Sequence, residues 1–213
     1  ASLKDYLFYE EPGVTLYCGD CREVLPLVES VEAIITDPVW PNATPELQGS
    51  DDPLALFSEA AKLFPMLCRR LVVQLGCDSD PRFLGGVPGE LPFFRVCWLE
   101  YVRPHYKGRL LYTGDIAYVF GEPPPARAGR TVLPGRIIQR LNKFRAETKE
   151  HPAPRQFEHV RWLVGWYCDE SVLDPFCGTG TTLAAAKDAG ISAIGIEIES
   201  KYCEIAVKRL RQE

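Results

Sequence analysis

The chain has 213 residues, of which 46% are hydrophobic and 25% are charged, and its formal net charge is −5. This length and composition are typical of a globular protein with one domain, or one domain that carries a substantial insertion. No apolar run approaches the roughly 20 residues that a membrane-spanning helix needs. No signal peptide is visible at the N-terminus, so we expect a cytoplasmic protein without a membrane partner.

Eight cysteines are spread along the chain. In a protein without a secretion signal they are expected to be reduced thiols. Cys18 and Cys21 have the spacing of half a zinc site or of a redox pair, but no second Cys-x-x-Cys occurs and the three histidines are scattered. We therefore predict no metal site.

Apolar runs with the length of strands alternate with helical patterns along the chain. Strands are expected at 14–17, 33–36, 71–74, 95–100, 116–120, 172–173 and 193–196. Helices are expected at 54–68, 160–167, 181–189 and 200–211. This alternation predicts an α/β fold, with a mostly parallel seven-stranded sheet and helices on both of its faces.

The strand expected at 33–36 runs into the segment Asp37-Pro38-Val39-Trp40-Pro41-Asn42. Asp37 offers carboxylate oxygens at the end of the strand. Pro38 fixes its own backbone, so its carbonyl oxygen is held rigidly. Trp40 supplies an aromatic surface. The same acid would also suit an ordinary turn at the end of a strand, without a part in catalysis.

Basic residues are concentrated between Arg103 and Arg161. This stretch has twelve Lys and Arg against five Asp and Glu, a charge of +7, so the remainder of the chain carries −12. Such asymmetry is the electrostatic pattern of a nucleic-acid-binding surface on an otherwise acidic domain. A solvated basic face without a partner is the alternative.

Within this basic stretch, residues 121–150 differ in composition from the rest. They begin with the stiff connector Glu122-Pro123-Pro124-Pro125 and continue through Arg- and Gly-rich sequence to a stretch at 134–144 that we expect to be helical. The cationic residues in and before this segment are candidates for nucleic-acid contacts. They are Arg103, Lys107, Arg127, Arg130, Arg136, Arg140 and Lys143.

The segment that begins at Asp174 is the most informative in the chain. It reads Asp174-Pro175-Phe176-Cys177-Gly178-Thr179-Gly180-Thr181-Thr182, and lies between an apolar strand and an Ala-rich helical run. Glycines in a loop between a strand and a helix allow a ligand to approach the backbone closely. No Lys follows Gly180, as a phosphate-binding P-loop requires, and Leu183 stands where a dinucleotide fingerprint has its third glycine.

About twenty residues later, Ala193-Ile194-Gly195-Ile196 predicts a short buried strand that ends in Glu197. An acid at the end of the second strand of a nucleoside-binding sheet accepts hydrogen bonds from ribose hydroxyls. The loop and the acid together predict a ligand with a ribose but no pyrophosphate, and S-adenosylmethionine fits this description. In that interpretation Asp174 faces the positively charged amino-acid end of the cofactor, and Glu197 faces its sugar.

Taken together, these segments resemble the amino-methyltransferases of DNA, which modify adenine N6 or cytosine N4. The Asp37 segment is similar to their Asp-Pro-Pro-Tyr/Phe/Trp motif, and its order resembles the class in which the catalytic motif precedes the cofactor loop. Two further segments are similar to the family, Leu16-Tyr17-Cys18-Gly19-Asp20-Cys21 and His151-Pro152-Ala153-Pro154-Arg155. The resemblance runs from about Leu16 to Leu210.

The resemblance implies a Rossmann-like methyltransferase fold over residues 1–213, with target recognition at 121–150, either alone or shared with a second subunit in a homodimer. It implies catalytic roles for Asp37, Pro38 and Trp40. It also implies a cofactor site that takes in the adenine-facing Asp20 and the loop after Asp174. The cofactor-binding residues are then Asp20, Asp174, Phe176, Gly178, Gly180, Thr181 and Glu197.

By this resemblance, Asp37 and the Pro38 carbonyl would accept hydrogen bonds from the two hydrogens of the target amine. This would free the nitrogen lone pair, which is otherwise delocalised into the ring. Trp40 would stack on the base, which is worth roughly 1–3 kcal/mol, and the base must be single-stranded or flipped out of a duplex. Asp37, where related enzymes carry serine, favours adenine N6 over cytosine N4.

Val39 stands where the family has a second proline. Because Val39 is freer in φ and adds an N–H to the site, a catalytically weakened nucleic-acid-binding homologue remains an alternative. A methyltransferase that acts on RNA or on a protein amide is another, since related motifs serve there. The basic stretch argues against a protein substrate but not against RNA. The family likeness also suggests a prokaryotic or phage protein with a restriction-modification role.

Overall fold

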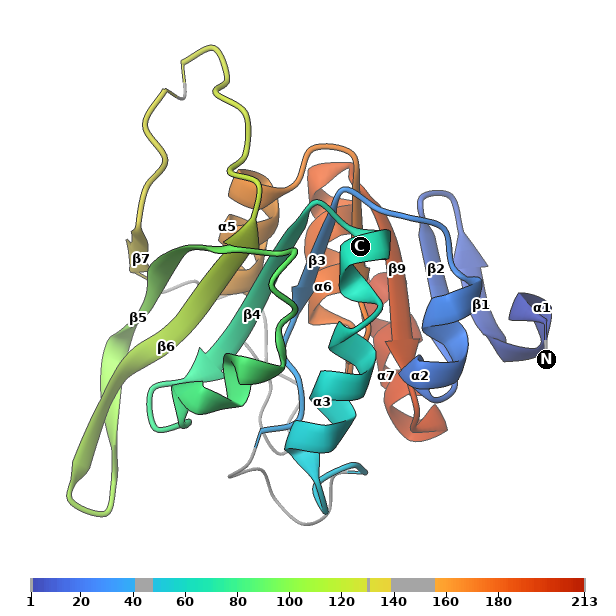
Figure 1. The fold of residues 1–213 in the computed structure, drawn as a ribbon, viewed down its shortest axis with the longest axis horizontal. Coiled ribbons are helices and arrows are strands. Elements are labelled where there is room, and N and C mark those ends of the chain that lie inside the picture. The colour runs from blue at the N-terminus through green and yellow to red at the C-terminus, as the bar shows by residue number, and fades with distance from the viewer. Residues whose placement is uncertain (1, 41–47, 130, 139–155, 213) are drawn as a thin grey trace.

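The computed structural model describes residues 2–40, 48–129, 131–138 and 156–212. Within these residues, nine strands form a single sheet in the order β1-β2-β9-β8-β3-β4-β6-β5-β7 (Figure 1). The strands are β1 (Leu7–Glu11), β2 (Val14–Cys18), β3 (Ala33–Thr36), β4 (Arg70–Gly76), β5 (Phe93–Lys107), β6 (Leu110–Gly121), β7 (Arg136–Ile138), β8 (Ser171–Asp174) and β9 (Ser192–Glu197).

The five strands β2, β9, β8, β3 and β4 are all parallel and lie side by side. Strands β6 and β5 continue the sheet as a long antiparallel hairpin, and β1 pairs antiparallel with β2 at the other edge. The expectation of a mostly parallel sheet is therefore confirmed. The carboxyl ends of all five parallel strands lie on the same side of the sheet. An open α/β sheet binds its ligands at these carboxyl ends.

The expected number of strands was wrong by two. All seven expected strands are present, but β1 and β7 extend the two edges of the sheet. Short edge strands lack the apolar runs by which buried strands are recognised, and β7 has only three residues. It also lies in the stretch 134–144 that we expected to be helical, where pairing with Trp98–Glu100 of β5 overrides the local pattern.

Helices cover both faces of the sheet, as expected (Figure 1). Helices α5 (Phe157–Tyr167), α6 (Thr181–Ala189) and α7 (Ser200–Leu210) pack on one face. The other face carries α2 (Cys21–Val24), α3 (Pro53–Ala61), α4 (Phe64–Leu67) and the 3-10 turns at Leu25–Leu27 and Pro81–Gly86. A short helix, α1 (Leu3–Tyr6), precedes β1.

The helix expected at 54–68 is divided into α3 and α4. Pro65 explains the break, because its nitrogen cannot donate a hydrogen bond to the carbonyl four residues earlier. The other three expected helices are present within three residues of their expected bounds.

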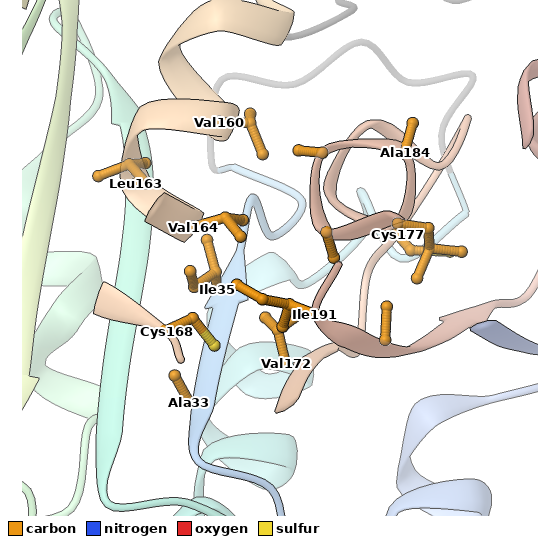
Figure 2. Packing of buried hydrophobic residues seen from close by; sticks show 14 of the residues in the cluster. Ala33, Ile35, Val160, Leu163, Val164, Cys168, Val172, Cys177, Ala184 and Ile191 are labelled. Carbon is orange, nitrogen blue, oxygen red and sulfur yellow. The ribbon is translucent and has the colours of Figure 1, made fainter. Parts of the chain in front are cut away.

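Each face of the sheet has its own apolar core. In the first, Val160, Leu163 and Val164 of α5 pack over Ala33 and Ile35 of β3 (Figure 2). The second core lies under α3 and α4 and is centred on the fully buried rings of Phe57 and Phe64, which meet edge to face. The two cores hold the central strands rigidly, so the residues at their carboxyl ends are fixed relative to one another.

None of the helices in the described ranges has the length and apolar character that crossing a bilayer requires. Among the same residues, no group of three or more His, Cys, Asp or Glu side chains is arranged to hold a metal ion. All eight cysteines are free thiols.

Candidate active site

A cavity of about 890 Å³ opens at the carboxyl ends of the parallel strands. The loops after β2, β9, β8, β3 and β4 form its floor, and the β5–β6 hairpin forms one wall. The structure brings together here most of the site residues that the sequence predicts. Those that line the cavity are Asp20, Asp37, Pro38, Trp40, Arg103, Lys107, Asp174, Phe176, Gly178, Thr181 and Glu197.

The catalytic segment and the glycine loop meet directly. Strands β3 and β8 are parallel neighbours, with Ile34 aligned to Leu173. The Thr36 hydroxyl donates a 2.8 Å hydrogen bond to Oδ1 of Asp174, which joins the residue before Asp37 to the first residue of the loop. Two segments that are 138 residues apart in sequence thus form one site.

Asp174 is almost fully buried, with 3% of its surface exposed. Its Oδ2 accepts a 2.6 Å hydrogen bond from the Thr182 hydroxyl, and its Oδ1 accepts a second bond from the Phe176 backbone N–H at 3.1 Å. Burial raises the pKa of Asp174 to about 6, although these hydrogen bonds oppose the shift. The carboxylate therefore organises the glycine loop and also faces the cavity.

Glu197 closes the other side of the loop. Its Oε2 accepts a 2.8 Å hydrogen bond from the Gly178 backbone N–H, and its Oε1 accepts one at 2.9 Å from Glu199. Burial raises the pKa of Glu197 to about 7. Each carboxylate oxygen retains acceptor capacity. Additional donors from a bound molecule, such as the two hydroxyls of a ribose, would stabilise the ionised form.

Asp20 caps α2 and is held by Arg22. It accepts the Arg22 backbone N–H at 2.9 Å and pairs with the guanidinium at 2.6 Å. Arg22 lowers the pKa of Asp20, and its guanidinium also pairs with Glu59 of α3 at 2.8 Å. Asp20 thus serves as a helix cap and, at the same time, lines the cavity.

Asp37 and Pro38 follow β3, with Asp37 half-buried and Pro38 buried. Trp40 lies across the end of β4, close to the backbone of Gly76. A Cβ atom on Gly76 would come within 2.7 Å of Cζ3 of Trp40. Because Gly76 has no side chain, the indole can lie close to the strand and beside the cavity.

The β5–β6 hairpin carries an array of rings, of which the sequence had pointed to His105 but not to Tyr101 or Tyr112. Tyr101, His105 and Tyr112 all line the cavity, with centroids 5.6 Å apart for Tyr101 and His105 and 5.4 Å apart for His105 and Tyr112. The Tyr112 hydroxyl donates a 2.6 Å hydrogen bond to Asp78, which is also 3.3 Å from the Lys107 ammonium.

Although burial opposes the shift, the bonds from Tyr112 and Lys107 lower the pKa of Asp78. The hydrogen bond to Asp78 raises the pKa of Tyr112 to about 12. Lys107 is thereby tied to the wall of the cavity. No short sequence motif predicts this array, because its rings come from both strands of the hairpin.

Gly180 does not line the cavity, in contrast to its neighbours in the loop. It has a positive φ of 76° at the start of α6, and a Cβ atom there would lie 2.8 Å from Cβ of Ala206. Its position lets α6 approach α7 closely. Thr181 does line the cavity, and its hydroxyl accepts a hydrogen bond from Arg209.

Two of the candidate nucleic-acid-binding residues lie outside the cavity. Arg127 donates hydrogen bonds to the carbonyls of Gly165 and Cys168, at the end of α5, and pairs with Asp169. Arg136 on the edge strand β7 lies 3.5 Å from Glu100. Arg130, Arg140 and Lys143 lie outside the described residues, as do Pro41, Asn42 and the segment 151–155.

The start of the 121–150 segment also lies far from the cavity. Strand β6 is antiparallel to β4, so β6 ends beside the amino end of β4, on the side opposite to the cavity. Residues 122–129 continue from there (Figure 1). The part of the basic stretch that reaches the cavity is the β5–β6 hairpin, through Arg103 and Lys107.

A search of protein families finds a model described as DNA methylase, N6_N4_Mtase, which matches residues 39–208. Among curated proteins, the chain is similar to the type II methyltransferase M.HinfI of Haemophilus influenzae, with 59% identity over 44 residues. That match spans 21% of this chain and 12% of the length of M.HinfI.

Two solved structures share the fold over nearly the whole chain. The M1.HpyAVI–SAM complex has a TM-score of 0.70 at 20% identity, and the alignment covers 93% of this chain and 99% of that one. PvuII DNA methyltransferase, which is cytosine-N4-specific, has a TM-score of 0.71 at 15% identity, with 94% and 87% covered. At these identities the likeness demonstrates the fold, and the Rossmann-like methyltransferase architecture is confirmed.

Proposed function

Because this chain belongs to the N6_N4_Mtase family of DNA methylases, we propose that it transfers a methyl group from S-adenosylmethionine to an exocyclic amine of a DNA base, with adenine N6 as the preferred target. The observation that carries this proposal is the junction of β3 and β8. It places Asp37 beside the Asp174 loop in one cavity, through the Thr36–Asp174 hydrogen bond of 2.8 Å.

The residues at the ends of β2, β8 and β9 fit S-adenosylmethionine. Glu197 would accept the ribose hydroxyls and Asp20 would lie near the adenine. Asp174 and the loop residues Phe176, Gly178 and Thr181 would face the amino-acid end. Two buried carboxylates with raised pKa values suit a ligand that brings hydroxyl donors and positive charge. When bound, this cofactor supplies the methyl group from a sulfonium.

The target amine would be held by Asp37 and by the carbonyl of Pro38. Two acceptors aimed at its two hydrogens favour a pyramidal nitrogen, whose lone pair is then available for attack. The acceptors also stabilise the positive charge that develops on the nitrogen, and the rest of the rate comes from orientation in the cavity. Trp40, which lies against Gly76, would stack on the base.

The adenine preference rests on Asp37, which stands where related cytosine enzymes carry serine. The fold is also that of a cytosine-N4-specific enzyme, so the fold by itself does not distinguish adenine from cytosine as the target. Relatives such as M.HinfI are type II methyltransferases. We propose that this chain likewise has a role in restriction-modification.

DNA would enter along the β5–β6 hairpin. Arg103 and Lys107 are exposed cations at the cavity, and the rings of Tyr101, His105 and Tyr112 offer stacking surfaces to unpaired bases. The base must leave the duplex to reach Asp37, at a cost of a few kcal/mol. In this proposal residues 1–213 form a single catalytic domain, and 121–150 contribute recognition together with the hairpin.

Val39 favours one competing function, a homologue that binds nucleic acid and cofactor but transfers slowly or not at all. It lines the cavity at the position where the family motif has proline. Cofactor binding without methyl transfer would support this alternative, and replacement of Val39 by proline would then raise the rate.

The test is methyl transfer from labelled S-adenosylmethionine to DNA and, in parallel, to RNA of the same sequence. Digestion to nucleosides then identifies the product. We expect N6-methyladenine in DNA. Label in N4-methylcytosine would correct the base, label in RNA alone would correct the substrate, and the absence of label with tight cofactor binding would favour the weakened homologue.

A further inference from the structure

One polar side chain interrupts the apolar interior of β4. Gln74 follows Leu71, Val72 and Val73 and precedes Leu75, and like them it is buried, with 2% of its surface exposed. It lines the cavity. Its amide nitrogen Nε2 has no hydrogen-bond partner among the described residues. A buried donor without an acceptor costs about 1–3 kcal/mol, so an acceptor from a molecule in the cavity would be favourable here.

The position of Gln74 relative to the proposed catalytic residues follows from the strand register. Thr36 of β3 aligns with Val73 of β4, so Gln74 is level with Asp37 on the adjacent parallel strand. Residues two apart on a strand project to the same face. Gln74 therefore shares its face with Gly76, the residue on which the Trp40 ring lies. Gln74 therefore neighbours the position of Asp37, and it lies two residues before the glycine that Trp40 approaches.

We propose that Gln74 determines base specificity, with its Nε2 donating a hydrogen bond to the ring nitrogen next to the target amine on the Watson–Crick edge. This inference rests on the proposed function. The ring nitrogen is N1 of adenine or N3 of cytosine, and both are acceptors. Guanine N1 and thymine N3 carry hydrogens, which would oppose the amide donor.

The arrangement is complementary to an amino base in two ways. Asp37 accepts from the exocyclic amine, and Gln74 on the next strand donates to the adjoining ring atom. An acceptor and a donor side by side match the donor–acceptor pair of adenine or cytosine, and they mismatch the acceptor–donor pair of guanine or thymine. A site that leaves a buried polar group unpaired with the wrong ligand discriminates strongly.

The carboxylate of S-adenosylmethionine is a second candidate acceptor for this amide. The geometry favours the base, because the residues proposed for the cofactor lie on β8, β9 and β2, whereas Gln74 lies on β4 on the far side of β3. The experiment is designed to separate the two sources.

The experiment compares the wild type with Gln74→Leu on three DNA oligonucleotides that carry the site mapped in the methylation assay. The first contains adenine at the target, the second 1-deazaadenine, which lacks the ring nitrogen, and the third 7-deazaadenine, which lacks the nitrogen on the other side of the amine. If the mapped product is a cytosine, 3-deazacytosine takes the place of 1-deazaadenine. Binding of S-adenosylmethionine is measured separately.

We expect Gln74→Leu to lower the single-turnover rate on adenine about tenfold, the loss of one hydrogen bond in a buried site. The wild type should lose a similar factor on 1-deazaadenine but not on 7-deazaadenine. The variant should lose nothing further on 1-deazaadenine, because its donor is already gone. Should Gln74→Leu fail to fold, Gln74→Met keeps the unbranched shape and also removes the donor.

Three results would overturn the proposal. The two losses could multiply in the variant, the variant could transfer at the parental rate, or it could weaken S-adenosylmethionine binding with an unchanged rate at saturating cofactor. The last result would assign Nε2 to the cofactor carboxylate. If the wild type methylates no DNA, the proposed function itself is wrong. The methylation assay on the wild type shows this before any variant is made.

Discussion

The two halves of the cavity differ in how their polar groups are satisfied. On the side of β2, β9 and β8, the carboxylates of Asp20, Glu197 and Asp174 each accept hydrogen bonds from their own chain. On the side of β4, the Gln74 amide nitrogen has no partner among the described residues. The first half is assembled before any ligand arrives, and in our proposal the second half is completed by the base.

This difference predicts that cofactor affinity and the rate of methyl transfer depend on different halves of the cavity. Changes on the β8–β9 side are expected to act on cofactor binding, because the residues there shape the glycine loop. Changes on the β3–β4 side are expected to act on the rate at saturating cofactor, because in our proposal the residues there contact the target base and not the cofactor.

The largest effect is expected from Asp37→Ala. Loss of an acceptor aimed at the reacting amine should lower the transfer rate about 10²- to 10³-fold, while S-adenosylmethionine binding stays within about twofold. Asp37→Asn, which keeps one acceptor oxygen, should retain more activity than Asp37→Ala. Single-turnover transfer and equilibrium binding measure the two quantities, with exposed Asp188→Ala as the matched control. Transfer at the parental rate would remove Asp37 from catalysis.

The next effect belongs to the other half. Glu197→Gln places an amide N–H₂ at one of the two oxygen positions that accept the backbone N–H groups of Gly178 and Glu199, and it removes an ionised acceptor. We expect cofactor affinity to fall about 10- to 100-fold, since hydrogen bonds to charged groups are worth about 1.5–3 kcal/mol each. The control is Glu204→Gln, an exposed residue of α7. An unchanged dissociation constant would contradict the ribose role.

The pH dependence of cofactor binding follows from the same carboxylate. Burial raises the pKa of Glu197 to about 7, and ribose hydroxyls would donate to its ionised form. Affinity should therefore be full above pH 7 and should fall as the pH drops below it, by at most about tenfold per unit. Titration calorimetry from pH 8 to pH 5.5 measures this.

In Glu197→Gln that dependence should be reduced, and titration of the ligand itself cancels in the comparison. A residual decline near pH 6 would be assigned to Asp174, whose pKa burial raises to about 6. Identical pH profiles for the wild type and the variant would exclude Glu197 as the titrating group.

The half of the site that is assembled in advance was also the more predictable one. The glycine loop after Asp174 and the acid Glu197 are local signals, since each is a strand end with characteristic residues. Their convergence with Asp37 followed from the parallel order of the strands. The role of Gly180 was the part that sequence could not give, because contact with Ala206 depends on how α6 packs on α7.

The other half depends on contacts between distant residues. Tyr112 meets Asp78 across 34 positions, and Tyr101 stacks on His159 with centroids 5.9 Å apart. Neither pair lies in a motif. Gln74 did leave a signal, a single polar residue in the apolar run from Leu71 to Leu75, but only the structure places it beside the cavity. The strand β7 was missed for the same reason, since pairing with β5 outweighed its local sequence.

The smallest effect is expected from Gly76→Ala, which examines the contact between Trp40 and β4. The added methyl group would lie 2.7 Å from Cζ3 of Trp40 and 3.1 Å from Oδ1 of Asp78, so the indole must move. A displaced ring stacks less well, and a loss of about 1 kcal/mol of base–aromatic stacking corresponds to roughly a fivefold lower rate at limiting DNA. Gly85→Ala, where a Cβ atom meets nothing within 4 Å, is the control. Cofactor affinity should be unchanged in both variants. If Gly76→Ala instead weakens cofactor binding, the two halves of the cavity are coupled through β4, and the division between affinity and transfer does not hold.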